Sequence, residues 1–125
     1  MPAYQAERTI RSVVQGIKGH GLPVIVVDDA SLDSTALEAR SAGAVVVSRQ
    51  TNGGKGRALR DGLVGALRGD YDWILSMDAD GQHLPSEIPH FLEVAALGKL
   101  DLILGNRMHN PRGMPFDRWL TNRLM

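Results

Sequence analysis

Hydrophobic positions along the chain alternate between the spacing of an amphipathic helix and the short continuous run of a buried strand. The helical spacing predicts a first helix from about Ala6 to His20. Its apolar residues fall three or four positions apart: Ile10, Val13, Val14 and Ile17. We expect this face to pack against the core, because such a stripe lies on one side of a helix.

Further helices are predicted along the rest of the chain. The second is capped by Asp33 and ends near Gly43, and its Thr35 and Glu38 have the spacing of a capping box. The third ends at Gly69, and its apolar face consists of Leu59, Leu63, Ala66 and Leu67. The fourth begins at Pro85, with an apolar face of Ile88, Phe91, Leu92 and Ala95. A last helix is expected to open at Pro115.

Four apolar runs between the helices predict strands: Val24–Val27, Ala44–Val47, Trp73–Met77 and Leu100–Leu104. Strands that alternate with helices form a mostly parallel sheet covered by helices on both faces, so the expected fold class is α/β. Ligands bind such sheets beyond the carboxyl ends of the strands. The residues that follow each strand are therefore the candidates for a site.

The composition limits the class of protein. The 125 residues, 43% of them hydrophobic, suffice for a single domain over residues 1–125. The absence of cysteine excludes disulfides, thiolate metal sites and cysteine nucleophiles. No apolar run approaches the roughly 18 residues that cross a bilayer, and the N-terminus lacks the apolar region of a signal peptide. These absences favour a cytoplasmic location.

The charges balance overall but are segregated along the chain. Fourteen Lys and Arg match fourteen Asp and Glu, so a basic nucleic-acid binder is not expected. Six acidic and no basic residues lie between Asp70 and Gly98, whereas four arginines and one acid lie from Arg107 to the end. This segregation fits two solvated faces, and it also fits a metal site beside an anion site.

The sharpest candidate site is Asp78-Ala79-Asp80, directly after the third predicted strand. Two carboxylates in this spacing can turn toward one hard cation, and oxygen ligands favour Mg²⁺ or Mn²⁺. Gln82 could add an amide oxygen and His83 a nitrogen. The alternative is structural, with Asp78 capping the next helix and Asp80 starting a turn.

Asp28 and Asp29 follow the first predicted strand. Adjacent side chains at a strand end point in opposite directions, so we expect at most one of the two to face a ligand. A carboxylate there could accept hydrogen bonds from a nucleobase or from ribose hydroxyls. The alternative is a turn that only ends the strand.

Two other strand ends carry cations. The glycine-rich segment 52–56 opens the third helix, where free backbone N–H groups and Lys55 suit a phosphate. It lacks the spacing of a P-loop, and its glycines can equally form a plain connection. Arg107 follows the fourth predicted strand and suits bidentate contact with a phosphate.

Five blocks in this order and spacing resemble a family 2 glycosyltransferase: PAYQAERTI, VIVVDDASLDST, NGGKGRALRDG, MDADGQHLPSEIP and DLILGNR. The resemblance covers essentially the whole chain. It is closest to the dolichol-phosphate mannosyltransferase-like branch of polyprenyl-phosphate glycosyltransferases. It implies the GT-A fold, a Rossmann-like α/β domain that transfers a sugar from a nucleotide-diphosphate donor.

Position by position, the resemblance implies a donor site. The residues implied to line the nucleotide pocket are Pro2, Ala3, Tyr4 and, in partial replacement of a family acid, Glu7. Asp29 would meet the base or ribose, with Asp28 beside it.

The resemblance also implies a metal site. Asp78 and Asp80 would hold Mg²⁺ or Mn²⁺ against the donor diphosphate, with Ala79 between them at the donor. Gln82 would be a further ligand.

Cationic residues would bind the phosphates. The resemblance implies this role for Arg107 and Arg118, toward donor or lipid acceptor, and makes Lys55 a candidate for the same region. Asp80 and Arg107 are the residues implied to be catalytic, because a metal and an arginine stabilise the charge on the leaving nucleoside diphosphate.

The acceptor decides whether a general base is needed. A lipid phosphate is already anionic near neutral pH and needs little help, and it would bring the protein to the inner face of the membrane. A sugar hydroxyl would require a carboxylate base, and none stands out in this chain.

Three positions, in two of the motifs, depart from the family pattern. The family has Asn and Glu after the tyrosine, where this chain has Gln5 and Ala6. The usual glycine of the Asp-Asp-Gly-Ser turn is replaced by Ala30, which is tolerable only where no positive φ is needed.

Family members also have a strand ahead of the Pro-Ala-Tyr block, at the centre of the sheet, whereas this chain begins at Met1. Its C-terminus lies inside the expected acceptor segment. We therefore expect a partial domain that lacks the usual first strand. The two strands beside it, which end at Asp28 and at Met77, would then expose unpaired edges or else pair with each other. Alone, the partial domain should be poorly stable and weakly active or inactive.

Other functions are open at this stage. A nucleotide-binding remnant without catalysis would share all these motifs. A receiver domain also has an acidic pair and a later aspartate, as at Asp28, Asp29 and Asp78, but it needs a lysine after its last strand, and Lys99 precedes one. A nucleotidyltransferase is less well supported, because its glycine-rich N-terminal signature is missing.

Overall fold

Strand β2 (Ile25–Asp28) lies at the centre of a three-stranded parallel sheet in the computed structural model, which describes residues 1–105. Strand β1 (Pro2–Ala3) pairs with β2 on one side, and β3 (Val45–Ser48) pairs with it on the other. The register brings the carboxyl ends of the three strands to one edge. Parallel neighbours need crossover connections, and helices supply them.

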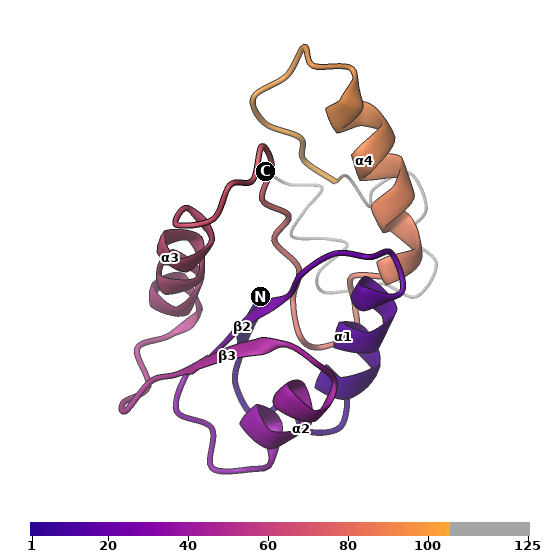
Figure 1. Ribbon diagram of the computed structural model, residues 1–125. Helices are drawn as coiled ribbons and strands as arrows, with labels where there is room; N and C mark the ends of the chain where they lie inside the picture. The colour runs from indigo at the N-terminus through magenta and orange to yellow at the C-terminus, as the bar shows by residue number, and fades with distance from the viewer. Residues whose placement is uncertain (106–125) are drawn as a thin grey trace, which may run out of the picture.

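Helices cover both faces of this sheet (Figure 1). Helices α1 (Ile10–Lys18) and α2 (Thr35–Ser41) pack against each other on one face, and α3 (Lys55–Ala66) packs against β1 and β2 on the other. A 3-10 turn, η1 (Pro85–Glu87), contacts α1 and leads into α4 (Ile88–Ala96). The arrangement confirms the predicted α/β fold.

The four helices predicted before residue 100 are all present, with shorter ends. Helix α1 begins at Ile10 rather than Ala6, because residues 7–9 form a turn. Glu38 does not close the predicted capping box, since it pairs with Arg11 of α1 instead. The helix predicted at Pro115 lies outside the described residues. Within residues 1–105, no helix combines the length and apolar character needed to span a membrane.

The core lies between the sheet and the inner face of α1. The four residues predicted for that face are all buried, and Ile10 and Val14 are completely so. Burying one such side chain contributes about 1.5–3 kcal/mol. Val26 joins the same cluster, whereas Val27 is buried on the other side of β2 against α3. As predicted, the strand is therefore buried on both faces.

Helix α3 buries a different face from the one that its leucines predict. Ala58 is completely buried, and a Cβ on Gly62 would lie 3.3 Å from Val27 Cγ2. Leu63 and Leu67 are 38% and 74% exposed. The prediction is wrong because small residues let the helix approach β2 closely. In addition, the sheet ends at β1, which leaves the leucines little strand surface to cover.

Two predicted strands, Trp73–Met77 and Leu100–Leu104, do not form. Met77 is buried, but Trp73 is 39% exposed and Leu102 is 70% exposed. A strand requires a hydrogen-bonded neighbour, and β1, with two residues, offers the first of these segments too short an edge. The two segments expected beside the family's first strand do not pair with each other, because β2 pairs with residues 2–3 and residues 73–77 form no strand.

Candidate functional site

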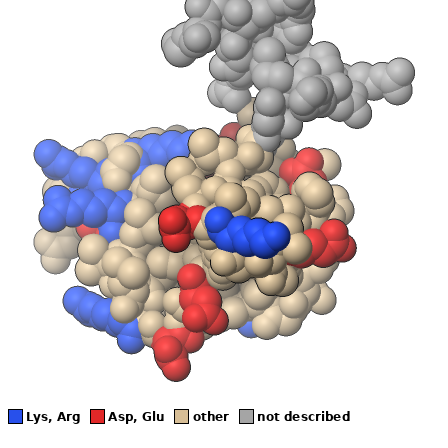
Figure 2. Space-filling model, turned by 90° about the horizontal axis from the view of Figure 1, so that it is seen from above, with Lys and Arg blue, Asp and Glu red and all other residues tan. Residues whose placement is uncertain are grey.

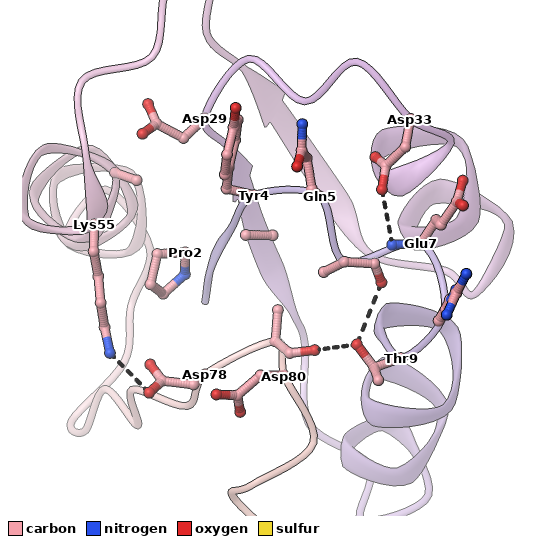
Figure 3. A pocket seen from close by; sticks show the side chains of 15 residues that line it. Pro2, Tyr4, Gln5, Glu7, Thr9, Asp29, Asp33, Lys55, Asp78 and Asp80 are labelled. Carbon is pink, nitrogen blue, oxygen red and sulfur yellow. Dashed lines mark hydrogen bonds and ion pairs between the residues drawn. The ribbon is translucent and has the colours of Figure 1, made fainter.

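A pocket of about 660 Å³ opens at the carboxyl ends of β1 and β2 (Figure 3). The loops that follow these two strands meet there with the start of α3 and with the loop 78–80. Ligands of parallel sheets bind at this edge. The predicted site residues that line the pocket are Pro2, Ala3, Tyr4, Glu7, Asp29, Lys55, Asp78, Ala79 and Asp80.

The loop 78–80 is anchored to two neighbouring segments. Thr9 Oγ1 donates a hydrogen bond to the carbonyl of Ala79 over 2.6 Å, which ties the loop to the start of α1. The backbone N–H of Asp78 donates to His83 Nδ1 over 2.9 Å. His83 Nδ1 is therefore an acceptor toward the backbone in this structure.

The two carboxylates of this loop offer hard oxygen donors to the pocket. Asp80 Oδ1 accepts the N–H of Gln82 over 2.9 Å, so Asp80 forms the predicted turn and still lines the pocket. Gln82 does not line it. Among residues 1–105, no three His, Cys, Asp or Glu side chains are grouped to hold a metal. A divalent cation bound by Asp78 and Asp80 would take its remaining ligands from phosphate or water, as Mg²⁺ commonly does.

A protein cation already lies on one of these carboxylates. Lys55 Nζ is 2.7 Å from Asp78 Oδ2, and the two side chains are 66% and 27% exposed. Lys55 is the first residue of α3, as the sequence predicted. In this structure its ammonium pairs with the acid that is expected to bind a metal.

Asp29 holds the loop that precedes α3. Its Oδ1 accepts the N–H of Gly53 over 2.9 Å, and its Oδ2 accepts the N–H of Gly54 over 2.7 Å. Arg49 Nη1 lies 3.3 Å from Oδ1, and the Asp29 side chain is only 4% exposed. Asp29 therefore lines the pocket while both of its oxygens are bound within the protein.

Asp28 points away from this pocket, which it does not line. Its Oδ1 accepts the N–H of Ser31 over 3.2 Å, and the residue is buried. Of the adjacent acids, one faces the pocket and one supports the turn after β2, as strand geometry predicts.

The residues after β1 interlock with the start of α2. Glu7 Oε2 accepts the N–H of Ser34 over 3.1 Å, and Asp33 Oδ2 accepts the N–H of Glu7 over 3.3 Å. Thr35 donates to Asp33 through its N–H and its hydroxyl. Desolvation acts to raise the pKa of Asp33, but the hydrogen bonds from Thr35 and Glu7 outweigh it and hold that pKa below its ordinary value. Both acids thus stabilise the start of α2.

Two residues beside the site have left-handed backbone conformations. Ala30 has a φ of +61° and Gln5 a φ of +48°, and the N–H of Gln5 donates to Ser31 Oγ over 2.9 Å. The condition for tolerating alanine here, that no positive φ is needed, is therefore not met, because the turn after β2 requires a conformation that glycine adopts more readily. Asn likewise tolerates this region better than Gln. Gln5 and Ala30, two of the three residues that depart from the family pattern, thus lie at strained positions.

Basic side chains gather on the α3 side of the molecule. Seen from above (Figure 2), Lys and Arg side chains are most frequent along the left edge, where α3 lies in Figure 1, whereas acidic side chains lie at the centre and toward the right. The exposed basic residues of this helix and the turn after it are Lys55, Arg57, Arg60 and Arg68. The excess of positive charge is local to α3, because residues 1–105 together carry ten Lys and Arg against thirteen Asp and Glu. The basic tail, with the predicted Arg107 and Arg118, lies outside the described residues.

Six residues that line the pocket were not predicted as site residues: Gln5, Ala6, Arg8, Thr9, Asp33 and Ala58. The helical pattern places Arg8 and Thr9 inside the first helix, and they reach the pocket only because α1 starts later. A threonine directly before the first buried residue of a helix is the signal that could have marked this boundary.

Known proteins are similar to this chain in sequence and in fold. The family described as glycosyl transferase family 2 matches residues 1–124. The undecaprenyl-phosphate mannosyltransferase of Micrococcus luteus is 38% identical over 107 residues, which are 82% of this chain and 42% of that protein. The UDP-N-acetylglucosamine–dolichyl-phosphate N-acetylglucosaminyltransferase of Methanococcus voltae is 29% identical over 143 residues, 98% of this chain and 57% of that protein. The chain spans about half the length of the curated relatives it matches.

A solved structure of a known protein is similar to this chain in fold. The glucosyl-3-phosphoglycerate synthase of M. tuberculosis superimposes with a TM-score of 0.57 at 30% identity, over 71% of this chain and 36% of that one. This likeness agrees with the expected GT-A fold. The family match includes the acidic segments on which the receiver-domain alternative rests, so that alternative is dropped. Matched over nearly its whole length, the chain belongs to glycosyl transferase family 2.

Proposed function

We propose that residues 1–125 are part of one GT-A domain that moves a sugar from a nucleotide-diphosphate donor to a polyprenyl phosphate. The observation that carries the proposal is the convergence of Asp78, Asp80 and Lys55 in one pocket at the carboxyl ends of β1 and β2. The acceptor class follows from relatives named as undecaprenyl-phosphate and dolichyl-phosphate sugar transferases.

The pocket offers separate contacts for the two ends of a donor. Tyr4, half exposed at the pocket wall, presents an aromatic ring to a nucleobase. The acidic loop 78–80 lies on a different side of the pocket (Figure 3). In this orientation the diphosphate lies near the acidic loop and the base near the segment after β1.

Bond breaking at the sugar leaves charge on the nucleoside diphosphate. A divalent cation, when bound, would neutralise that charge, and Asp78 and Asp80 are the oxygen donors that fit Mg²⁺ or Mn²⁺. Lys55 can add an N–H donor toward the same phosphates. Arg107 and Arg118 are proposed to complete the cationic surroundings, and Gln82 to join the metal ligands.

The acceptor needs no general base in this proposal. A lipid phosphate is anionic near neutral pH, so its oxygen can attack the sugar carbon directly. Such an acceptor lies in a membrane, which would bring the protein to the inner membrane face. The basic edge along α3 suits anionic lipid headgroups at that surface.

Donor binding is tested by thermal shift with UDP-, GDP- and dTDP-sugars in the presence of Mn²⁺. At a ligand concentration about 100 times Kd, binding adds about 2.7 kcal/mol of stability. We expect a rise in Tm with one donor class, abolished by a chelator and by Asp80→Asn. Asp70→Asn, an exposed acid outside the pocket, should leave the rise intact. Absence of stabilisation by every donor would contradict the proposal.

A nucleotide-binding remnant is the second candidate. Its support is the short sheet, since β1 has two residues and Trp73–Met77 forms no strand. Metal-dependent binding of a nucleoside diphosphate without sugar transfer to a short polyprenyl phosphate would favour the remnant. Full turnover by the isolated chain would exclude it.

A further inference from the structure

The ion pair between Lys55 and Asp78 places a cation of the protein where a metal ligand is expected. Lys55 Nζ lies 2.7 Å from Asp78 Oδ2, and both residues line the pocket (Figure 3). The ammonium occupies one oxygen of the Asp78 carboxylate and repels a second cation that approaches it. Asp78 therefore becomes a better metal ligand when the lysine moves away.

Both ends of this pair are held by separate anchors. On the lysine side, the carboxylate of Asp29 binds the N–H groups of Gly53 and Gly54, which fixes the chain directly before Lys55. On the acid side, Asp78 donates its N–H to His83. These backbone contacts, set elsewhere in the fold, bring Lys55 within reach of Asp78.

The pair is also open to exchange. The Lys55 side chain is 66% exposed, and ion pairs with this much solvent access are weak. A diphosphate entering the pocket would give the ammonium another anionic partner within its reach, since a lysine has four rotatable side-chain bonds. The acid would then be released at the moment when phosphate oxygens are present to complete a metal's coordination.

We infer that Lys55 is a resident counter-cation that weakens metal binding by Asp78 until a nucleotide diphosphate draws the ammonium away, so that nucleotide binding strengthens metal binding. The inference rests on the proposed function and adds a specific order of events to it. It separates Lys55 from a residue that only binds phosphate, because such a residue does not pair with a metal-binding carboxylate before the nucleotide arrives.

The test measures Mn²⁺ affinity from the electron paramagnetic resonance signal of the free ion, with and without GDP or UDP. For the wild-type chain we expect weak Mn²⁺ binding alone and tighter binding with a nucleotide. Lys55→Met should bind Mn²⁺ alone about threefold more tightly, the scale set by a partly exposed ion pair. The same variant should bind nucleotide more weakly, and nucleotide should enhance its Mn²⁺ affinity less.

Arg57→Met is the matched control, because it removes an exposed positive charge from the same turn of α3 but outside the pocket. Lys55→Gln is the second variant, and Lys55→Arg should restore much of the wild-type behaviour. Unfolding curves of all variants verify that each is folded. If Arg57→Met tightens Mn²⁺ binding as much as Lys55→Met, general electrostatics explains the result and the inference is overturned.

Two failures are distinguishable. If the wild-type chain binds nucleotide with Mn²⁺ but neither Lys55→Met nor Lys55→Gln changes Mn²⁺ affinity alone, the inference falls and the proposed function stands. If the wild-type chain binds no Mn²⁺ even with nucleotide, the metal site of the proposed function falls, and the inference falls with it.

Discussion

The hydroxyl of Thr9 donates a 2.6 Å hydrogen bond to the carbonyl of Ala79, seventy residues away along the chain. The bond connects the turn before α1 to the middle of the acidic loop. Ala79 is buried, so its carbonyl has little access to water. We conclude that Thr9 positions the two aspartates from outside the loop.

Replacing Thr9 with Val keeps the shape of the side chain and removes the donor. An unsatisfied buried carbonyl costs about 1–3 kcal/mol, and we expect a loss of this size in the free energy of unfolding measured with urea. Affinity for Mn²⁺ with nucleotide should fall as well. Thr9→Ser keeps the hydroxyl and should retain most of both. Equal behaviour of the Val and Ser variants would show that the hydrogen bond has no positioning role.

Asp29→Asn should mainly lower the free energy of unfolding and have little direct effect on nucleotide affinity. The carboxylate accepts two backbone N–H groups and lies beside Arg49, and breaking a buried ion pair costs about 3–5 kcal/mol. Asp28→Asn, which removes the charge at an acceptor of one longer bond from Ser31, should have a smaller effect on unfolding. A loss of nucleotide affinity in Asp29→Asn with unchanged stability would instead make Asp29 a direct ligand of the nucleotide.

Ala30→Gly should stabilise the chain. A residue with a Cβ is strained by about 1–2 kcal/mol in the left-handed region, and Ala30 lies there with a φ of +61°. Glycine relieves the strain but adds freedom to the unfolded chain, so we expect a net gain of about 1 kcal/mol. Ala36→Gly, within helix α2, should lose about 1 kcal/mol. If both variants lose stability in chemical denaturation, the strain at Ala30 is not real.

Gly16→Ala tests the contact between α1 and η1. A Cβ at Gly16 would lie 2.8 Å from Pro85 Cγ, and overpacking of this kind costs about 1–3 kcal/mol. Gly56→Ala is the matched control, because a Cβ there has no atom within 4 Å. It should gain up to about 1 kcal/mol from helix propensity. A gain at Gly16 equal to that at Gly56 would contradict the packing of Pro85 on α1.

The spacing of apolar residues predicts helices and strands correctly where their packing partners are close in the sequence. The buried face of α1 and strand β2 are both read correctly from apolar spacing. The face of α3 and the strands at Trp73–Met77 and Leu100–Leu104 are not, because they depend on which segments lie beside them in the sheet. An apolar run indicates that a segment can be buried but does not supply its hydrogen-bonded neighbour.

For the candidate site, too, local motifs predict the location but not the contacts between distant residues. The order of strands and motifs predicted that the loops after the strands meet at one edge of the sheet. The pocket at that edge contains most of the predicted donor residues that the structure describes. The partners of each side chain could not be read from sequence. Asp29 binds Gly53 and Gly54, and Lys55 pairs with Asp78, because the fold brings residues more than twenty positions apart within hydrogen-bonding distance.

Paramagnetic broadening by Mn²⁺ in amide NMR spectra, recorded with GDP or UDP bound, tests the proposed site most directly. Broadening should centre on Asp78, Ala79 and Asp80 and should reach Lys55 and Thr9 across the pocket. It should disappear in Asp80→Asn. Broadening centred on another part of the chain, or no broadening with either nucleotide, would contradict the proposed site.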